Sequence, residues 1–403
     1  MHDSTNPRLP VRSLPASEIL RPKVLILFGT RPEAIKLAPV IHALNARNFE
    51  TVVVSSSQHT HLLRPFLKSL DIRVDHDLKV MKKDQTPNDV CSRVVSKLDK
   101  ILAAEQPDVI LVQGDTTTAL AGALAGFNHK IAVGHVEAGL RSGNAMSPFP
   151  EEMNRRLISQ IATFHFAATE QNRRALLAEK VPEEQIFITG NPVVDSLQKI
   201  VKNLNPSRKI QELLDSTEGK KRLLLTTHRR ESFGTTMTAN LGVIRAFIKS
   251  HPDVCLLFPV HPNPNVRAAA SEILGDAQNI HLLDPLDYSD FLALQRSSWL
   301  IVSDSGGVQE EAPSLGKPLL VIRENTERPE AVTAGVAKLV GSSSTKLRLL
   351  LEENYASDTW IRSVKETANP FGDGRAADRI ARIIERKFAS EQEPDKERLL
   401  RRF

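Results

Sequence analysis

The stretch DSGGVQEEAPSLGKP (304–318) places small residues after an apolar run and two glutamates at the start of a predicted helix. Ser305, Gly306 and Gly307 leave backbone N–H groups uncovered, and a helix N-terminus attracts an anion such as phosphate. Glu311 follows about one helical turn later, where its carboxylate can accept hydrogen bonds from hydroxyl groups. A ligand with a phosphate end and a sugar end satisfies both features, so the stretch predicts a nucleoside diphosphate site.

A second polar stretch, FGTRPEAIKLAP (28–39), follows the first predicted strand. Thr30 and Glu33 have the spacing of a helix capping box. Arg31 and Lys36 lie near the start of this predicted helix, where both cations can bind a phosphate. A well-capped helix with solvated cations explains the same residues. The stretch is neither a G-x-G-x-x-G fingerprint nor a P-loop, so dinucleotide and ATP binding are not indicated.

Three acidic residues are expected at adjacent strand ends in the first half of the chain: Asp115 in QGDTTT, Glu137 in HVEAGLRSG and Glu151 in PFPEEMNRR. Carboxylates that face one pocket repel one another, which raises some of their pKa values and suits them to acid–base catalysis. Alone, Asp115 is more typical of a helix cap or turn, and Glu151 with Arg155 could be an ordinary i,i+4 helix pair. Three acids at neighbouring strand ends favour a catalytic site, with Arg141 close by.

The second half adds a histidine and an aromatic residue. TTHRRESFG (226–234) places His228, Arg229 and Arg230 just past a strand, which favours a diphosphate clamp over a structural histidine. Phe291 in DPLDYSDF can pack against a flat base, or equally fill the core beside a capped helix. No zinc, calcium or nucleophile-elbow pattern is present, so we expect neither a metal nor a serine nucleophile.

Short β-branched runs alternate with helical patterns along most of the chain, which predicts parallel strands covered on both faces. The runs form two series, separated by a polar, poorly periodic stretch after residue 202. We therefore predict an α/β fold of two Rossmann-like, doubly wound domains that face a cleft, with ligands at the carboxyl ends of the strands. The predicted strands are 24–28, 51–56, 108–114, 131–137 and 164–169, then 222–228, 254–261, 279–285, 299–304 and 318–323.

The domain boundaries follow from this pattern. We place the domain with the carboxylates at residues 22–192 and the nucleotide-binding domain at 193–374. Residues 1–21 form an extension that we expect to be mobile, because it is polar and contains prolines. Residues 375–403 are predicted to form a helix that packs back across the hinge, followed by a charged tail.

Composition excludes several classes of protein. The 403 residues are 41% hydrophobic and 25% charged, the profile of a soluble globular protein. The net charge is +5, but no basic stripe with interleaved aromatic residues accompanies it, so we expect no nucleic-acid partner. No apolar run is long enough to span a bilayer, and the first twenty residues lack a secretory pattern. With only two cysteines, far apart in sequence, we expect a cytoplasmic protein without membrane insertion.

The polar stretches together resemble a known family. GTRPEAIKLAP, QGDTTT, HVEAGLRSG, PFPEEMNR, ITGNPVVD, THRRESFG, DSGGVQEEAPSLGKP, RENTERPEAV and NPFGDGRAADRI are similar, in order, to motifs of the bacterial non-hydrolysing UDP-N-acetylglucosamine 2-epimerases. The resemblance runs from about residue 23 to 384. It implies the two-domain fold of GT-B glycosyltransferases, a homodimer, and interconversion of UDP-N-acetylglucosamine and UDP-N-acetylmannosamine without a metal or nicotinamide. The product would supply ManNAc for cell-surface polysaccharide.

The resemblance also implies roles for individual residues. The catalytic group would be Asp115, Glu137, Glu151 and His228, with His228 also contacting the diphosphate. The substrate-binding group would be Arg31, Lys36, Arg141, Arg155, Leu286, Phe291, Ser305, Gly306, Gly307, Glu311 and Arg328. Leu286 stands where some members have glutamine. Because that contact resembles a backbone one, uracil binding would survive.

The implied reaction explains why carboxylates and cations occur together. The C2 hydrogen of the sugar is not acidic, but loss of UDP from C1 makes its removal an elimination that gives 2-acetamidoglucal. Protonation on the other face and re-addition of UDP complete the epimerisation. Two other enzymes share much of the pattern: a GT-B glycosyltransferase, which needs an acceptor, and a hydrolysing epimerase, which releases free ManNAc. A nucleotide-sugar sensor without activity is a third alternative.

Overall fold

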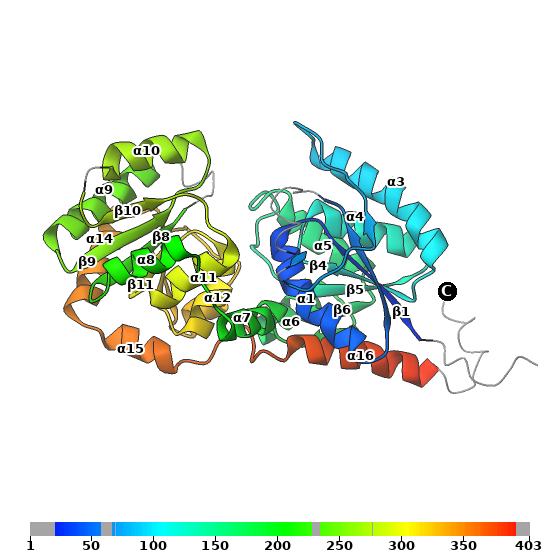
Figure 1. The fold of residues 1–403 in the computed structure, drawn as a ribbon. Coiled ribbons are helices and arrows are strands. Elements are labelled where there is room, and N and C mark those ends of the chain that lie inside the picture. Colours follow the sequence, from blue (N-terminus) through cyan, green and yellow to red (C-terminus); the bar gives the residue numbers. More distant parts are fainter. Residues whose placement is uncertain (1–20, 58–66, 69, 228–233, 276, 392–403) are drawn as a thin grey trace, which may run out of the picture.

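The computed structural model describes residues 21–57, 67, 68, 70–227, 234–275 and 277–391, in which the chain forms two parallel β-sheets (Figure 1). The first sheet has seven strands in the order β3-β2-β1-β4-β5-β6-β7. Its strands are β1 (Lys23–Phe28), β2 (Glu50–Ser55), β3 (His76–Asp77), β4 (Val109–Gln113), β5 (Ala132–Ala138), β6 (Phe164–Ala167) and β7 (Ile186–Ile188). The helices of this half are α1 (Arg31–Asn45), α3 (Pro87–Glu105), α4 (Thr117–Asn128), α5 (Glu151–Ile161), α6 (Glu170–Ala178), the 3-10 helix η1 (Glu183–Gln185) and α7 (Pro192–Lys202).

The second sheet has six strands in the order β10-β9-β8-β11-β12-β13. Its strands are β8 (Lys221–Thr226), β9 (Val254–Pro259), β10 (Ile280–Leu283), β11 (Leu300–Ser303), β12 (Leu319–Val321) and β13 (Ala337–Leu339). The helices are α8 (Arg208–Ser216), α9 (Thr235–Ser250), α10 (Pro264–Leu274), α11 (Tyr288–Ser297), α12 (Gly306–Glu311), the 3-10 helix η3 (Ala312–Leu315), α13 (Pro329–Thr333), α14 (Ser344–Ala356), α15 (Thr359–Glu366) and α16 (Ala376–Glu391). Counted from its own first strand, each sheet contains the order 3-2-1-4-5-6, so the predicted doubly wound α/β class is confirmed.

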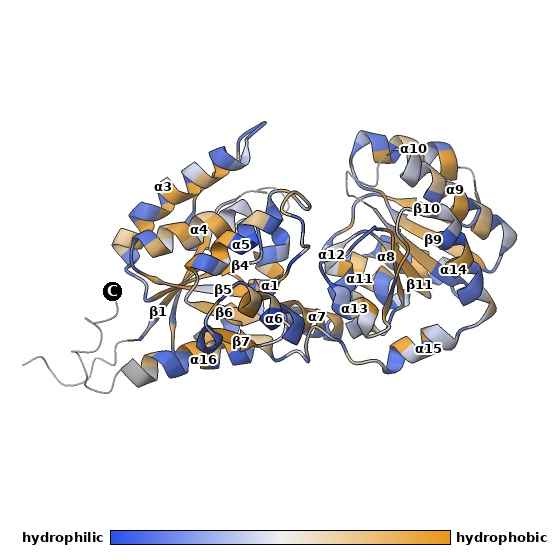
Figure 2. Ribbon diagram, turned by 180° about the vertical axis from the view of Figure 1, so that it is seen from behind, coloured by the Kyte–Doolittle hydropathy of each residue, from blue (hydrophilic) through white to orange (hydrophobic). Residues whose placement is uncertain are grey.

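Alternate residues of the central strands face opposite helical layers, which explains their uninterrupted apolar sequences. In β1, Ile26 and Phe28 pack into one hydrophobic cluster, and Leu25 and Leu27 pack into the cluster on the other face. All four side chains are fully buried. Figure 2 shows the strands as the hydrophobic interior of each domain, with hydrophilic residues on the surrounding helices. A sheet covered on both faces therefore requires the apolar runs that the sequence contains.

The ten strands predicted from these runs are all present, whereas three further strands were missed. These are β3, β7 and β13, which span two or three residues and lie at sheet edges. Such short segments carry no periodic signal of their own. Their pairing depends on the neighbouring strand, as when Val54 of β2 sets the register of His76 in β3.

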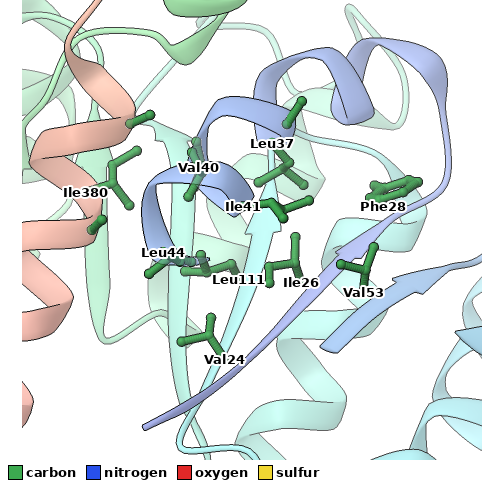
Figure 3. Close-up of a cluster of buried hydrophobic side chains, with 14 of the residues drawn as sticks. Val24, Ile26, Phe28, Leu37, Val40, Ile41, Leu44, Val53, Leu111 and Ile380 are labelled. Carbon is green, nitrogen blue, oxygen red and sulfur yellow. The ribbon is translucent and has the colours of Figure 1, made fainter. Parts of the chain in front are cut away.

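Two helices connect the halves of the molecule. The chain passes between the sheets near Asn191, whose backbone N–H donates to the Phe371 carbonyl at 2.7 Å. Helix α7 begins there and packs its apolar residues into a cluster with the second sheet. Helix α16 follows the second sheet but lies against the first domain, where Ile380 faces Val40 and Leu44 of α1 (Figure 3). Helix α16 therefore contributes side chains to the hydrophobic core of the first domain.

None of the helices in the described ranges is both long and apolar enough to cross a bilayer. Residues 1–20 of the predicted extension 1–21, and residues 392–403 of the predicted charged tail, lie outside the described residues.

The position of Ile380 predicts a stability effect. Ile380 is fully buried, so Ile380→Ala removes apolar contacts between α16 and α1 and should destabilise the protein by about 2–5 kcal/mol. Leu349→Ala on α14 is the control, because Leu349 is 55% exposed and its truncation should change stability by less than about 0.5 kcal/mol. Thermal and guanidinium unfolding would measure both. Equal effects of the two variants would show that α16 does not stabilise the first domain.

Candidate active site

A cavity of about 710 Å³ lies between the two domains, at the carboxyl ends of their strands. In the first domain it opens where the strand order reverses, between β1 and β4, which is where doubly wound sheets bind ligands. Its polar lining comprises Thr30, Arg31, Glu33, Lys36, Gln113, Asp115, Thr116, Glu137, Ser147, Glu151, Arg155, Tyr288, Ser305, Glu310, Glu311 and Arg328.

A second cavity of about 760 Å³ lies beside the interdomain crossings and is lined partly by Gly190 and Asn369. It contains none of the predicted site residues. Its Arg379 and Asp373 pair with each other at 2.7 Å and are therefore already neutralised. Of the two cavities, only the one at the strand ends is lined by predicted catalytic and binding residues. It is therefore the better candidate for an active site.

Glu33 fixes the start of α1 at the floor of the candidate site. Its carboxylate accepts hydrogen bonds from the backbone N–H groups of Gly29 at 3.1 Å and Thr30 at 2.8 Å. The hydroxyls of Thr30 and Thr116 donate to it as well, each at 2.7 Å. Burial nevertheless outweighs these donors and raises the pKa of Glu33 to about 7. The bond to Thr116 ties the start of α1 to that of α4, and so fixes where Lys36 lies.

Glu137 lines the cavity from a strained position in β5. Its φ of 66° is unusual for a residue with a side chain, and the register between β5 and β6 shifts at this point. Its Oε1 lies 2.5 Å from Lys36 Nζ and accepts a hydrogen bond from Asn191 at 2.9 Å, while Gln113 donates to Oε2. Local strain that is held by such contacts is typical of functional sites.

Glu310 and Arg328 bring charges of the second domain to the same place. Arg328 Nε donates to Glu310 Oε1 at 2.5 Å, and Lys36 Nζ lies 3.1 Å from Glu310 Oε2. One guanidinium nitrogen of Arg328 lies 3.8 Å from Glu137 Oε1. Gly306 allows this approach, because a Cβ at that position would lie 2.6 Å from Arg328 Nη1. We refer to Lys36, Glu137, Glu310 and Arg328 as the interdomain charge cluster.

Members of the interdomain charge cluster shift one another's ionisation. Burial opposes the charge of Lys36, but Glu137 and Glu310 outweigh it and raise the pKa of the lysine. Burial also opposes ionisation of Glu137, yet Lys36 and Arg328 together lower its pKa to about 2. For Glu310, burial outweighs the same two cations, and with the neighbouring Glu137 it raises the pKa to about 7. Near neutral pH the cluster therefore holds two cations, one carboxylate and one carboxyl that can gain or lose a proton.

Glu311 lies beside this cluster with both oxygens occupied. The Tyr288 hydroxyl donates to Oε1 at 2.8 Å, and Gln295 donates to Oε2 at 2.7 Å. Burial raises the pKa of Glu311, although these donors oppose the shift. Its orientation is thus set by two side chains of α11, and a hydroxyl-bearing ligand would share these acceptors.

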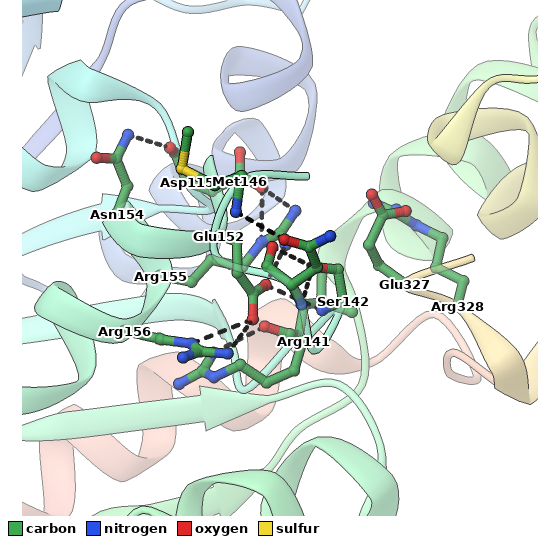
Figure 4. Close-up of polar contacts among 12 residues, drawn as sticks. Asp115, Arg141, Ser142, Met146, Glu152, Asn154, Arg155, Arg156, Glu327 and Arg328 are labelled. Atoms are coloured by element: carbon green, nitrogen blue, oxygen red, sulfur yellow. Dashed lines mark hydrogen bonds and ion pairs between the residues drawn. The ribbon is translucent and has the colours of Figure 1, made fainter. Parts of the chain in front are cut away.

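Asp115 and Arg155 also line the cavity, and Figure 4 shows the polar contacts around them. Arg155 donates from Nε to Asp115 Oδ2 at 2.8 Å, and its Nη1 pairs with Glu152 at 3.0 Å. Glu152 is completely buried and also accepts from Arg156 and from the backbone N–H of Ser142. Burial opposes its ionisation, but these partners lower the pKa of Glu152. Glu152 thus orients Arg155, and Arg155 in turn orients Asp115.

Comparison with known proteins supports a single family. A family model for UDP-N-acetylglucosamine 2-epimerase matches residues 42–385. The chain belongs to the UDP-N-acetylglucosamine 2-epimerase family. It is 46% identical to the UDP-N-acetylglucosamine 2-epimerase of Escherichia coli K12 over 374 residues, which is 90% of this chain and 98% of the relative.

Solved structures of the 2-epimerase family have the same fold. The UDP-GlcNAc 2-epimerase of Neisseria meningitidis, solved with UDP-GlcNAc bound, matches with a TM-score of 0.84 and 41% identity over 90% of this chain and 100% of that one. The glycotransferase of kitacinnamycin matches with a TM-score of 0.62 at 12% identity over 91% of this chain and 99% of that one, which shows a likeness of fold alone. The predicted GT-B-like arrangement is confirmed.

The structure brings together most of the residues for which the epimerase motifs implied a role. Those that line the cavity are Arg31, Lys36, Asp115, Glu137, Glu151, Arg155, Phe291, Ser305, Gly306, Gly307, Glu311 and Arg328. Arg141 and Leu286 lie outside the lining. Arg141 binds the Glu179 carboxylate at 2.6 and 2.8 Å, and Leu286 packs against the second hydrophobic core. His228 falls outside the described residues.

Sequence reasoning missed several polar residues of this candidate site. Glu310 and Glu152 each stand next to a predicted residue but were passed over, because adjacent glutamates offer no local signal for which one is buried. Gln113, Asn191 and Tyr288 act through contacts with chain segments far away in sequence. Within the described residues, no group of three or more His, Cys, Asp or Glu side chains is arranged to hold a metal ion.

The burial of Glu152 predicts a large effect of its removal. Glu152→Ala leaves Arg155, whose side chain is 5% exposed, without one of its two carboxylates, and should destabilise the fold by about 3–5 kcal/mol. Glu170→Ala is the control, since Glu170 also pairs with two arginines but its side chain is 46% exposed, so it should cost less than about 1 kcal/mol. Thermal unfolding at neutral pH would compare them. A melting point of Glu152→Ala equal to that of the control would contradict this role.

Proposed function

We propose that this chain interconverts UDP-N-acetylglucosamine and UDP-N-acetylmannosamine as a non-hydrolysing isomerase. Family membership supports the substrate class, because the Neisseria meningitidis relative binds UDP-GlcNAc. The observation that carries the proposal is the meeting of Lys36 and Arg328 with Asp115, Glu137 and Glu151 in one interdomain cavity. Cations there can hold a diphosphate while carboxylates move a proton on the attached sugar.

The reaction follows as an elimination and an addition. A carboxylate removes the proton from C2, the electron pair of that bond forms the C1–C2 double bond, and the C1–O bond breaks to release UDP. The intermediate is 2-acetamidoglucal. A second carboxylate protonates C2 on the other face, and UDP adds back to C1. Both steps are redox-neutral, so we propose no cofactor.

The contacts of the three carboxylates suggest a separate role in the reaction for each. Lys36, Gln113 and Asn191 already engage the oxygens of Glu137, so Glu137 would mainly hold Lys36 beside the departing diphosphate. Asp115 and Glu151, which also line the cavity, would carry out the proton transfers at C2, one on each face of the sugar. Arg31, Lys36 and Arg328 would stabilise the charge that develops on UDP.

The second domain would bind the nucleotide. Phe291 and Glu311 line its side of the cavity, where an aromatic ring can pack against uracil and a carboxylate can accept from ribose hydroxyls. Gly306 and Gly307 add backbone N–H groups for the diphosphate, whereas the N–H of Ser305, expected from sequence to be uncovered, donates to the Ser303 hydroxyl at 2.9 Å. Helix α12 has only six residues, so these N–H groups rather than a helix dipole would make the contact.

We further propose a cytoplasmic homodimer that supplies ManNAc for cell-surface polysaccharide, without a nucleic-acid partner. These features rest on the family resemblance. Light scattering after size-exclusion chromatography would give the oligomeric state, and a mass of one chain would contradict the dimer.

Two alternatives keep the same fold. A GT-B glycosyltransferase would have a similar fold, but a transferase does not need three carboxylates in its cavity. A hydrolysing epimerase would use the same elimination but add water to the intermediate. The products distinguish all three reactions.

Incubation with UDP-GlcNAc in D₂O tests the proposal directly. We expect UDP-ManNAc with deuterium at C2, and deuterium also entering C2 of the remaining UDP-GlcNAc, because the C2 proton exchanges with solvent at the carboxylates. Proton and phosphorus NMR would follow both. Release of free ManNAc with UDP would instead identify a hydrolysing epimerase, and an unchanged substrate would contradict the proposal.

Substitution of the acids should separate catalysis from binding. Asp115→Asn and Glu151→Gln should each lower kcat about 10²-fold or more, the scale of lost acid–base catalysis, while the Kd for UDP changes little. Glu137→Gln should lower kcat as strongly. Glu212→Gln on α8 is the control, because the Glu212 side chain is 63% exposed and does not line the cavity. Normal turnover in all three site variants would remove the carboxylates from the mechanism.

A further inference from the structure

Glu310 is a buried acid of the cavity that the proposed reaction does not use. Its side chain is 1% exposed, and it is contributed by the second domain, whereas the proposed catalytic acids come from the first. An unused carboxylate is costly to bury unless cations neutralise it. Its location beside the proposed diphosphate contacts therefore needs an explanation.

The contacts of Glu310 are those expected of a bound phosphate. Its two oxygens lie 2.5 Å from Arg328 Nε and 3.1 Å from Lys36 Nζ, so one carboxylate joins a cation from each domain. Asn369 donates to its backbone carbonyl at 2.9 Å, which fixes the end of α12 from which the side chain extends. A diphosphate that binds Lys36 and Arg328 must compete with Glu310 for both.

We propose that Glu310 is a positioning residue that stands in for the diphosphate, holding Lys36 and Arg328 in place until the ligand arrives and then accepting a proton from solvent as the ligand takes over these cations. The proposal rests on the proposed function, because it needs a diphosphate ligand in this cavity. It concerns ligand binding, however, and can be tested apart from turnover.

Charge balance supports the proton transfer. The charged groups that face the Glu310 carboxyl are Lys36 from α1, Glu137 from β5 and Arg328 from the segment before α13, and Tyr288 of α11 also lies within electrostatic range. With both glutamates ionised the cluster is neutral, so a diphosphate would add uncompensated negative charge. The carboxyls of Glu310 and Glu137 are within hydrogen-bonding reach, so a proton on Glu310 can bridge them.

The pKa of Glu310 sets the pH range over which ligand binding takes up a proton. Its pKa is already raised to about 7, by burial first, and a diphosphate raises it further. Above pH 7 the free protein has lost the proton and must regain it to bind the ligand, so affinity should fall as pH rises. Below about pH 6 the proton is already present, and binding takes up none.

Calorimetry in buffers of different ionisation enthalpy measures this proton directly. UDP-GlcNAc is the probe, because its diphosphate diester does not titrate near neutral pH and epimerisation neither consumes nor releases a proton. At about pH 7.5 we expect the wild-type protein to take up about half a proton or more per ligand, and its Kd to weaken about five- to tenfold between about pH 6 and 8. Glu310→Gln should lose most of the uptake and most of the pH dependence, and should bind more tightly than wild type at about pH 8.

Glu327→Gln is the matched control. Glu327 is buried, lies 3.7 Å from Arg328 and precedes it in sequence, but pairs with Arg323 and does not line the cavity. This variant should keep the wild-type proton uptake. That result would show that the uptake depends on Glu310 itself and not on loss of any buried acid near Arg328.

Several results would overturn the inference. Equal uptake in wild type and Glu310→Gln would assign the proton to another group, such as His228. Zero uptake by the wild type would contradict it even if Glu310→Gln failed to fold. If UDP-GlcNAc does not bind at all, the proposed function fails as well. If UDP-GlcNAc binds with proton uptake that depends on Glu310 but is not epimerised, the proposed function fails and this inference is supported.

Discussion

The burial of four opposite charges between two domains is the constraint on which the rest of the structure depends. Lys36 and Glu137 come from the first domain, Glu310 and Arg328 from the second, and no side chain among them is more than 10% exposed. Each charge would be strongly disfavoured alone in such surroundings, because burial removes its hydration. Lys36 pairs with Glu137, and Arg328 with Glu310, inside their own domains, and contact between the domains gives each group a second counter-ion.

The surrounding structure holds this cluster in place. Glu33 fixes the start of α1, and therefore Lys36, through donors from two helix starts. Asn191 binds Glu137 at the point where the chain passes to the second domain, so the crossing and the site are joined by one side chain. Helix α16 then returns from the second domain to pack on α1. The strands and the interdomain crossings together bring the carboxyl ends of both sheets close to the interdomain charge cluster.

The fold was largely predictable from sequence, because buried parallel strands need continuous apolar runs and these are visible without any tertiary information. The edge strand β13, with three residues, was not predictable, since only pairing with β12 defines it. The cavity residues could be recognised where they lie at the end of a strand, as Asp115 after β4 and Glu137 near the end of β5 do. Glu310 could not be recognised from sequence, because it joins the site through its contact with Lys36, which is distant in sequence. Arg141 shows the converse: its motif suggested the pocket, but Glu179 binds its guanidinium elsewhere.

The central claim is that this cavity binds a nucleotide diphosphate between the two domains, with cations from both. A crystal structure with UDP bound tests it most directly. The account predicts the diphosphate in ionic contact with Lys36 and Arg328, with uracil on the Phe291 side of the second domain. A diphosphate out of reach of both cations, or UDP bound in the second cavity beside Asn369, would contradict it.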